Sequence, residues 1–230
     1  MAKFLYIDTS GETAIVALSN NETILAIEQN NQANSHAAFL QIAVKKLMDK
    51  ACIPFVDLDA IVVTMGPGSY TGLRVGLSSA KGIAYALNKP LIGLSTLALL
   101  KEHANNHEQV VQNKNKVQIF SMIDAKRMEV FGAVYKADNS VVIAPKAIVL
   151  EASYLQKLLQ NGPVICCGNA ITKTKEILKH PNLYFIETPY NIDNMVHLAQ
   201  TKWATKDFED IAYSSPAYLK EFYQIPSKKS

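Results

Sequence analysis

The sequence of residues 60–76, AIVVTMGPGSYTGLRVG, joins an apolar run to a glycine-rich turn. The continuous apolar run at residues 60–63 is typical of a central strand that is buried on both faces of a sheet. The turn leads into a predicted helix at about residues 73–87. This stretch therefore predicts a strand–turn–helix unit, and the segments on either side of it complete the fold.

The flanking segments repeat one order of elements. In the first half, strands are predicted at residues 4–7, 13–18, 23–28, 60–63 and 90–94, with helices that begin near Ser35, Leu73 and Thr96. In the second half, strands are predicted at residues 117–124, 129–135, 141–149, 164–167 and 184–186, with helices at 151–160, 171–178 and 192–206. The order βββαβα occurs twice, as in the duplicated ribonuclease-H-like fold of actin, sugar kinases and Hsp70-type ATPases. We therefore expect an α/β fold of two such subdomains.

A polar segment at residues 101–116 is the clearest break in composition and marks the expected boundary. Residues 1–105 are predicted to form the N-terminal subdomain and residues 106–230 the C-terminal subdomain. The tail after about residue 214 is a candidate to pack back onto the first half.

Charge and composition limit the class of protein. The 230 residues carry 23 basic and 20 acidic side chains, a net charge of +3 that is too small for a dedicated nucleic-acid binder. The N-terminal residues lack the apolar core of a signal peptide, and no apolar stretch is long enough to span a membrane. Three cysteines without such a signal indicate reduced thiols. We expect a cytoplasmic protein with no membrane partner.

A polar turn, Asp8-Thr9-Ser10-Gly11, follows the first predicted strand. In the actin-like architecture this turn faces the cleft, where hydroxyl and backbone N–H groups hold phosphate and a carboxylate holds Mg²⁺ through water. Asp124 supplies a second acid, but no second phosphate loop is found. Two interpretations stay open: a polar turn closed by its own side chains, or the nucleotide site of a phosphotransferase or weak ATPase that uses Asp8 and Thr9.

Small residues recur every four positions in the predicted helix after the glycine-rich turn. They are Gly72, Gly76, Ala80 and Ala84, and they form a flat ridge that allows another element to approach closely. Two interpretations stay open here as well. The ridge packs on the chain's own sheet, or it forms a subunit interface with Tyr70 and Arg74 as anchors at its edge.

A possible metal motif, His103-x-x-x-His107, lies in the polar boundary segment with few apolar neighbours. Solvated histidines are favoured over a metal site, because no third ligand is clearly placed.

Several of these motifs together resemble the TsaB (YeaZ) family, accessory proteins in making threonylcarbamoyladenosine at position 37 of tRNA. The residues that carry the resemblance are 7–10, His36, 66–76, 80–82, 92–97, 123–130 and 216–220. The match is dense over residues 4–130 and thin from about 136 to 212. The catalytic paralogue, TsaD, has a metal-binding His-x-x-x-His that the corresponding residues 95–100 lack.

The resemblance implies a non-catalytic subunit that binds the TsaD paralogue, works with the TsaE ATPase, forms homodimers and meets tRNA through the complex. It implies no cofactor for this chain itself and allows ATP or ADP at the interface of the complex. The implied partner or dimer interface comprises Tyr70, Thr71, Gly72, Leu73, Arg74, Gly76, Ala80 and His36. The implied degenerate nucleotide cleft comprises Asp8, Thr9, Ser10 and Asp124.

Overall fold

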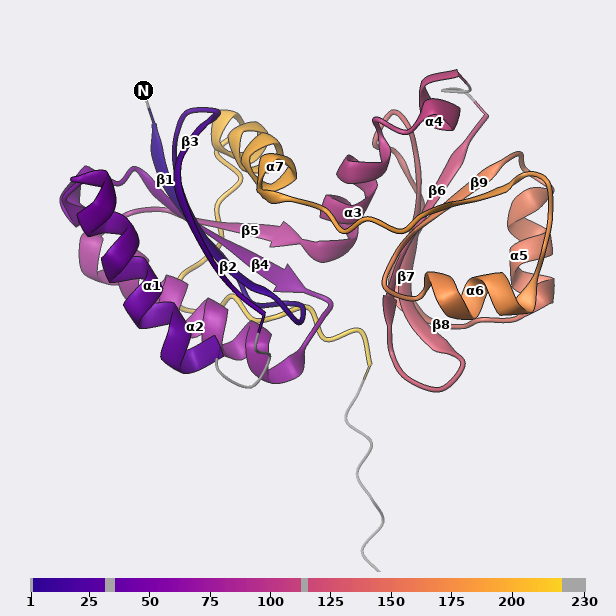
Figure 1. Cartoon of the computed structure of the whole chain (residues 1–230), viewed down its shortest axis with the longest axis horizontal. Helices are drawn as coiled ribbons and strands as arrows, with labels where there is room; N and C mark the ends of the chain where they lie inside the picture. The colour runs from indigo at the N-terminus through magenta and orange to yellow at the C-terminus, as the bar shows by residue number, and fades with distance from the viewer. Residues whose placement is uncertain (1, 32–35, 113–115, 221–230) are drawn as a thin grey trace, which may run out of the picture.

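Two five-stranded sheets form the framework of the computed structural model, which describes residues 2–31, 36–112 and 116–220 (Figure 1). The first sheet contains β1 (Lys3–Asp8), β2 (Ala14–Asn20), β3 (Thr23–Asn30), β4 (Ala60–Gly66) and β5 (Leu91–Ser95), in the order β3-β2-β1-β4-β5. The second contains β6 (Gln118–Asp124), β7 (Glu129–Lys136), β8 (Val141–Val149), β9 (Val164–Gly168) and β10 (Leu183–Ile186), in the order β10-β9-β6-β7-β8.

The two sheets have the same topology. In each, the first strand in sequence is central and pairs antiparallel with the second strand and parallel with the fourth. This duplication confirms the predicted α/β ribonuclease-H-like fold.

Helices on one face of each sheet bury alternate strand residues. In the first half, α1 (His36–Ala51) and α2 (Tyr70–Leu87) pack against Leu5 and Ile7 of β1. In the second half, Leu155 of α5 (Ala152–Leu159) packs in the same core as Phe120 of β6, and α6 (Ile171–Ile177) follows β9. Strand side chains alternate between faces, so each sheet also needs cover on its other side.

The helix α3 (Thr96–Ala104) lies between the two sheets (Figure 1). Its Leu99 joins the apolar core of the first sheet, while Leu97 and Leu100 pack with Ile119 of the second. The two halves are therefore joined by a shared apolar layer. The short helix α4 (Glu108–Gln112) follows, and residues 113–115 lie outside the described structure.

After β10 the chain returns to the first sheet, which corrects the expectation that residues 106–230 form one subdomain. Met195 and Ala199 of α7 (Ile192–Ala204) pack against Phe4 and Tyr6 on the face opposite α1 and α2. These two aromatic side chains are fully buried, so the first sheet is incomplete without α7. The tail then runs along the first half. Its first contact there is the Glu209 N–H, which donates to Leu91 O at 2.8 Å.

The helix α2 begins at Tyr70, three residues before the predicted start. The Ser69 hydroxyl accepts a hydrogen bond from the Gly72 N–H at 3.2 Å, and Asn88 ends the helix in the left-handed conformation with φ 52°. Ser35, near which the first helix is predicted to begin, lies outside the described residues. Among the described helices none has the length and apolar character needed to cross a membrane.

Candidate functional site

The turn after β1, Asp8–Ser10, packs directly on the glycine-rich turn and the start of α2. The Ser69 N–H donates to Ser10 O at 2.7 Å, and the Thr9 hydroxyl donates to Gly72 O at 2.7 Å. A Cβ atom added to Gly72 would overlap the carbonyl oxygen of Thr9, and one added to Gly76 would overlap the Thr9 hydroxyl. Glycine is therefore required at both positions by close approach.

Because of this contact, part of the predicted interface is buried inside the protein. Gly72, Leu73, Gly76 and Ala80 are buried against the chain's own strands, because the small-residue ridge faces β1 and the Thr9 turn. Of the two interpretations of the ridge, the internal one holds in this structure.

His36 is also buried, at the start of α1, where its Nε2 lies 3.1 Å from Gly11 O. Three of the eight predicted interface residues are exposed: Tyr70, Thr71 and Arg74. They lie together on the first turns of α2, and the Arg74 guanidinium carbon lies 4.0 Å from the centre of the Tyr70 ring. The exposed residues of the predicted interface therefore all lie at the N-terminal end of α2.

The Asp8 carboxylate is buried, and both of its oxygens accept hydrogen bonds from the chain itself. Its Oδ1 accepts hydrogen bonds from the Ser10 N–H at 2.9 Å, the Ser10 hydroxyl at 2.7 Å and the Thr64 hydroxyl at 2.8 Å. Its Oδ2 accepts one from the Tyr190 phenol at 2.7 Å. Asp8 is 3% exposed, so the turn is closed by its own side chains, as one of the two interpretations predicted.

Tyr190, which sequence reasoning missed, seals this turn from the other half of the chain. It lies between β10 and α7, and its ring packs against the apolar cores of both halves. Burial, followed by the charge of Asp8, raises the pKa of Tyr190 well above its usual range, so the phenol is a donor at neutral pH. Nothing in the local sequence signals this role, because 182 positions separate the two partners.

Asp124 occupies the equivalent position at the end of β6 and has a different environment. Its Oδ1 accepts hydrogen bonds from Lys173 Nζ and from the Lys126 N–H, both at 2.6 Å, while the Asn169 side chain accepts from the Asp124 N–H. Partial burial raises the pKa of Asp124, but these donors outweigh it and hold the pKa below its usual value. Asp124 is exposed and bonds within the second half, so the structure does not join it to Asp8.

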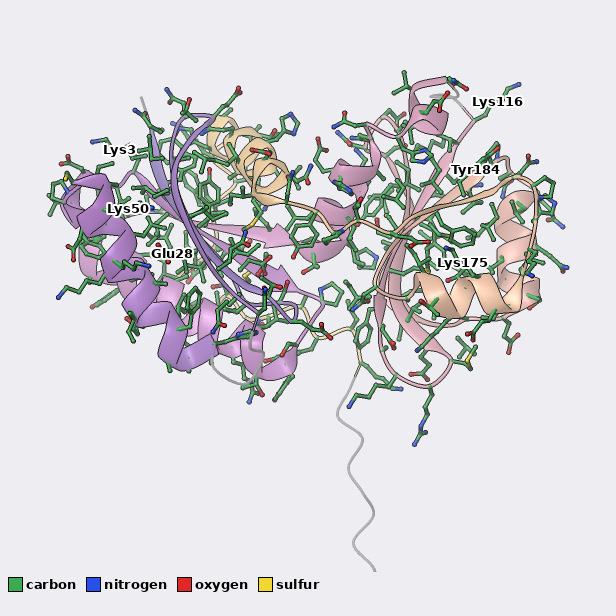
Figure 2. All side chains as sticks on the ribbon, in the orientation of Figure 1. Lys3, Glu28, Lys50, Lys116, Lys175 and Tyr184 are labelled. Carbon is green, nitrogen blue, oxygen red and sulfur yellow. The ribbon has the colours of Figure 1, made fainter. Side chains whose placement is uncertain are left out.

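A hollow of about 710 Å³ lies beside β9 and α6, and neither Asp8 nor Asp124 lines it. Its lining residues are Gly168, Asn169, Ile171, Thr172, Lys175, Glu176, Lys179 and Glu187. Lys175, labelled in Figure 2, forms an ion pair with Glu187 across part of this lining. Two of the four charged side chains that line the hollow are therefore paired with each other.

No metal centre is formed by the part of the chain that the structure describes, since no three His, Cys, Asp or Glu side chains gather there. His103 Nε2 lies 2.8 Å from the Thr188 hydroxyl, which joins α3 to the segment that leads to Tyr190.

Comparisons with known proteins match the chain to proteins of threonylcarbamoyladenosine synthesis. Residues 23–228 match the family model described as TsaD: tRNA N6-adenosine threonylcarbamoyltransferase. The chain is 30% identical over 237 residues to the tRNA threonylcarbamoyladenosine biosynthesis protein TsaB of Escherichia coli, with 99% of this chain and 100% of that protein covered. It is 29% identical over 178 residues to the Bacillus subtilis protein of the same name, covering 76% of this chain and 74% of that one.

A solved structure, YeaZ from Pseudomonas aeruginosa, superposes with a TM-score of 0.77 at 23% identity, covering 95% of this chain and all of that one. The shared fold agrees with the sequence relationship over nearly the whole chain. The chain belongs to the TsaB (YeaZ) family.

Proposed function

We propose that this chain is a non-catalytic accessory subunit in the synthesis of threonylcarbamoyladenosine on tRNA. Its partner is a TsaD-type transferase, which moves the threonylcarbamoyl group from threonylcarbamoyl-AMP to N6 of adenosine 37 in tRNAs that read codons beginning with A. The names of the Escherichia coli and Bacillus subtilis relatives support a role in this modification. In this proposal the present chain supplies a binding surface in the cytoplasm, and the partner supplies the reaction centre.

The environment of Asp8 is the observation that carries the non-catalytic part. A carboxylate that holds a hydrated Mg²⁺ needs an oxygen open to solvent. Four donors from the chain surround the Asp8 oxygens, and the Thr9 hydroxyl is committed to Gly72 O. This arrangement favours a structural turn over the phosphotransferase or weak ATPase that the same residues suggested.

The binding surface in this proposal is the outer face of α1 and α2. It carries two large apolar side chains, Ile42 at 70% exposed and Tyr85 at 80% exposed, and Gln41 Nε2 donates to Ser79 Oγ at 3.3 Å between the helices. Exposed apolar side chains on adjoining helices are typical of a protein contact. We assign this face to the transferase or, in its absence, to a second copy of the chain. The TsaE-type ATPase, tRNA, and ATP or ADP join at the level of the complex.

Reconstitution of the tRNA modification from purified components tests the proposal. We expect product with this chain present and a loss of product when it is left out. Unchanged product without the chain would contradict the assignment.

A second measurement separates an accessory subunit from an enzyme. The isolated chain is titrated with ATP and Mg²⁺ by calorimetry, and nucleotide hydrolysis is followed in the same sample. We expect neither tight binding nor turnover. Tight binding with turnover by the isolated chain would favour the phosphotransferase or ATPase instead.

A further inference from the structure

The chain after α7 forms a fixed strap, residues 209–220, across the first half. Two backbone N–H groups of the strap donate to the first sheet: Glu209 to Leu91 O at 2.8 Å and Ala217 to Met65 O at 2.7 Å. Lys81 Nζ donates to two strap carbonyl groups, Ala212 O at 3.1 Å and Ser214 O at 3.0 Å. Lys220 forms an ion pair with Glu129. Glu209 also forms a β-bridge with Leu91, so the strap covers the exposed edge of the first sheet. The strap is therefore held by its backbone at several points.

Near its end the strap places Tyr218 beside Arg74 at the start of α2. The Arg74 Nε–H donates to the Tyr218 hydroxyl at 2.9 Å, and the two tyrosine ring centres, of Tyr70 and Tyr218, lie 5.3 Å apart. The Arg74 guanidinium carbon lies 4.0 Å from the centre of the Tyr70 ring and 5.8 Å from that of Tyr218. The guanidinium is thus held in one orientation by a hydrogen bond and by two aromatic faces.

Arg74 is exposed, yet it forms no ion pair with an acidic side chain within the described ranges of the chain. Its Nε is used by Tyr218, and the outer edge of a guanidinium offers two further parallel N–H groups. That edge matches the two oxygens of a carboxylate. The charge is therefore preorganised for an acidic partner that the described residues do not supply.

We propose that Tyr70, Arg74 and Tyr218 form a docking site for a carboxylate side chain on the partner protein, and that the strap completes this site. The inference rests on the proposed function, because it adds the chemistry of the contact and a second element, the strap, to the partner surface on α2. Tyr218 is a positioning residue that fixes the guanidinium, and Arg74 makes the contact.

A protein carboxylate fits this site better than a nucleic-acid phosphate. Binding to a phosphate backbone uses several cations together, but the neighbouring cations are committed: Lys81 to carbonyl groups of the strap and Lys220 to Glu129. Tyr70 and Tyr218 are 36% and 42% exposed, and their rings are tilted against each other beside Arg74. Tyrosine and arginine are enriched among the residues that contribute most to binding at the centre of protein interfaces.

Binding of the purified transferase partner to the full chain tests the site. We expect Arg74→Ala to weaken binding by about 50-fold, as for truncation of one member of an interfacial charge pair. Arg74→Lys should lose about tenfold, because an ammonium group lacks the planar fork. Tyr218→Phe should lose about fivefold, because it keeps the ring and removes only the hydroxyl that orients the guanidinium.

Two matched variants serve as controls. Arg127 is the other arginine of the chain and is exposed on the second half, and Tyr213 is an exposed tyrosine of the strap. Arg127→Ala and Tyr213→Phe should leave the affinity within about twofold of the wild type. A folded Arg74→Ala variant with wild-type affinity for the transferase would overturn the inference, while the proposed function would stand. Loss of tRNA retention by Arg74→Ala with unchanged transferase affinity would assign the site to phosphate instead.

A wild-type chain that does not bind the transferase at all would contradict the proposed function, and a separate measurement then decides the inference. The chain has two arginines, so ¹⁵N spectra of the arginine Nε–H groups give one signal for each. On titration with sodium acetate against a sodium chloride reference, we expect the Arg74 signal to shift and the Arg127 signal to stay. Equal responses of the two arginines would overturn the carboxylate site.

Discussion

Asp8 and Asp124 end equivalent strands of a duplicated fold, and their environments are opposite. Asp8 is buried beneath four hydrogen bonds, one of them from Tyr190 on the returning chain. Asp124 is exposed and is held by Lys173 of its own half. The same strand end is therefore a buried structural joint in one half of the fold and a surface ion pair in the other.

The difference follows from which elements cover each turn. The glycine-rich turn and α2 lie against the turn after β1, and the segment before α7 closes it from the other side. Within the part of the chain that the structure describes, the turn after β6 is contacted by Lys173 and Asn169 of the α6 region. Burial therefore makes the first turn sensitive to small changes, while solvent screens the second.

The largest effect is expected where the first turn is tightest. Gly72→Ala should lower the free energy of unfolding by about 3 kcal/mol, because the new methyl group overlaps the carbonyl of Thr9. Gly82 is the matched control in the same helix, since it is exposed and a Cβ there meets no atom within 4 Å. Gly82→Ala should raise stability by up to about 1 kcal/mol. Similar urea midpoints for the two variants would contradict the close packing of the turn.

Removal of the Asp8 charge should have the next largest effect. Asp8→Asn should lower the free energy of unfolding by about 2 kcal/mol, because charge-assisted hydrogen bonds from buried donors are weakened. Chemical denaturation at neutral pH measures this change. A loss no greater than that of Asp124→Asn would remove the contrast between the two strand ends.

The closing contact from Tyr190 should contribute less. Tyr190→Phe should cost about 1 kcal/mol, because the ring remains packed while Asp8 Oδ2 loses its donor. Tyr85→Phe, at a tyrosine that is 80% exposed on α2, is the control and should change stability by less than about 0.5 kcal/mol. Equal stability of the two variants would show that the Tyr190 hydroxyl does not hold the turn.

The smallest effect is expected at Asp124, and it depends on pH. The pKa of Asp124 is lower in the folded chain than in the unfolded chain, so its ion pair stabilises the fold above about pH 4 and this contribution is lost as the pH falls through the folded pKa. Asp124→Asn should cost about 0.5 kcal/mol at pH 7, because the pair with Lys173 is partly exposed. The difference between variant and wild type should shrink as the pH falls below about 4 and the carboxylate takes up a proton. A stability difference that did not change with pH would have a cause other than the charge of Asp124.

The order of strands and helices along the chain and most helix positions could be predicted from the sequence, because apolar runs and turn residues are local signals. The burial of Ala60–Gly66 and the helix after the glycine-rich turn are examples. The position of α7 could not be predicted in this way. The apolar face of α7 could cover either sheet. It covers the first sheet because the side chains of β1 on that face would otherwise be exposed to solvent.

The sequence indicates some residues of the candidate site, Asp8 and Arg74 among them, but not the tyrosines that form hydrogen bonds with them in the structure. The small-residue ridge was identified correctly as a surface for close approach, but the approaching element is the Thr9 turn of the same chain. Tyr190 and Tyr218 meet Asp8 and Arg74 across 182 and 144 positions of sequence. Periodicity and spacing carry no information about such distant pairs, so a structure was needed to find them.

Reconstituted tRNA modification with an Asp8→Asn/Asp124→Asn double variant tests most directly whether the chain supplies a surface or a reaction centre. The variant is used at a temperature where circular dichroism shows it folded, and at a concentration that saturates the transferase. We expect the same initial rate as with the wild-type chain, and no product when the chain is left out. A folded, partner-bound double variant that fails to support product formation would contradict this expectation.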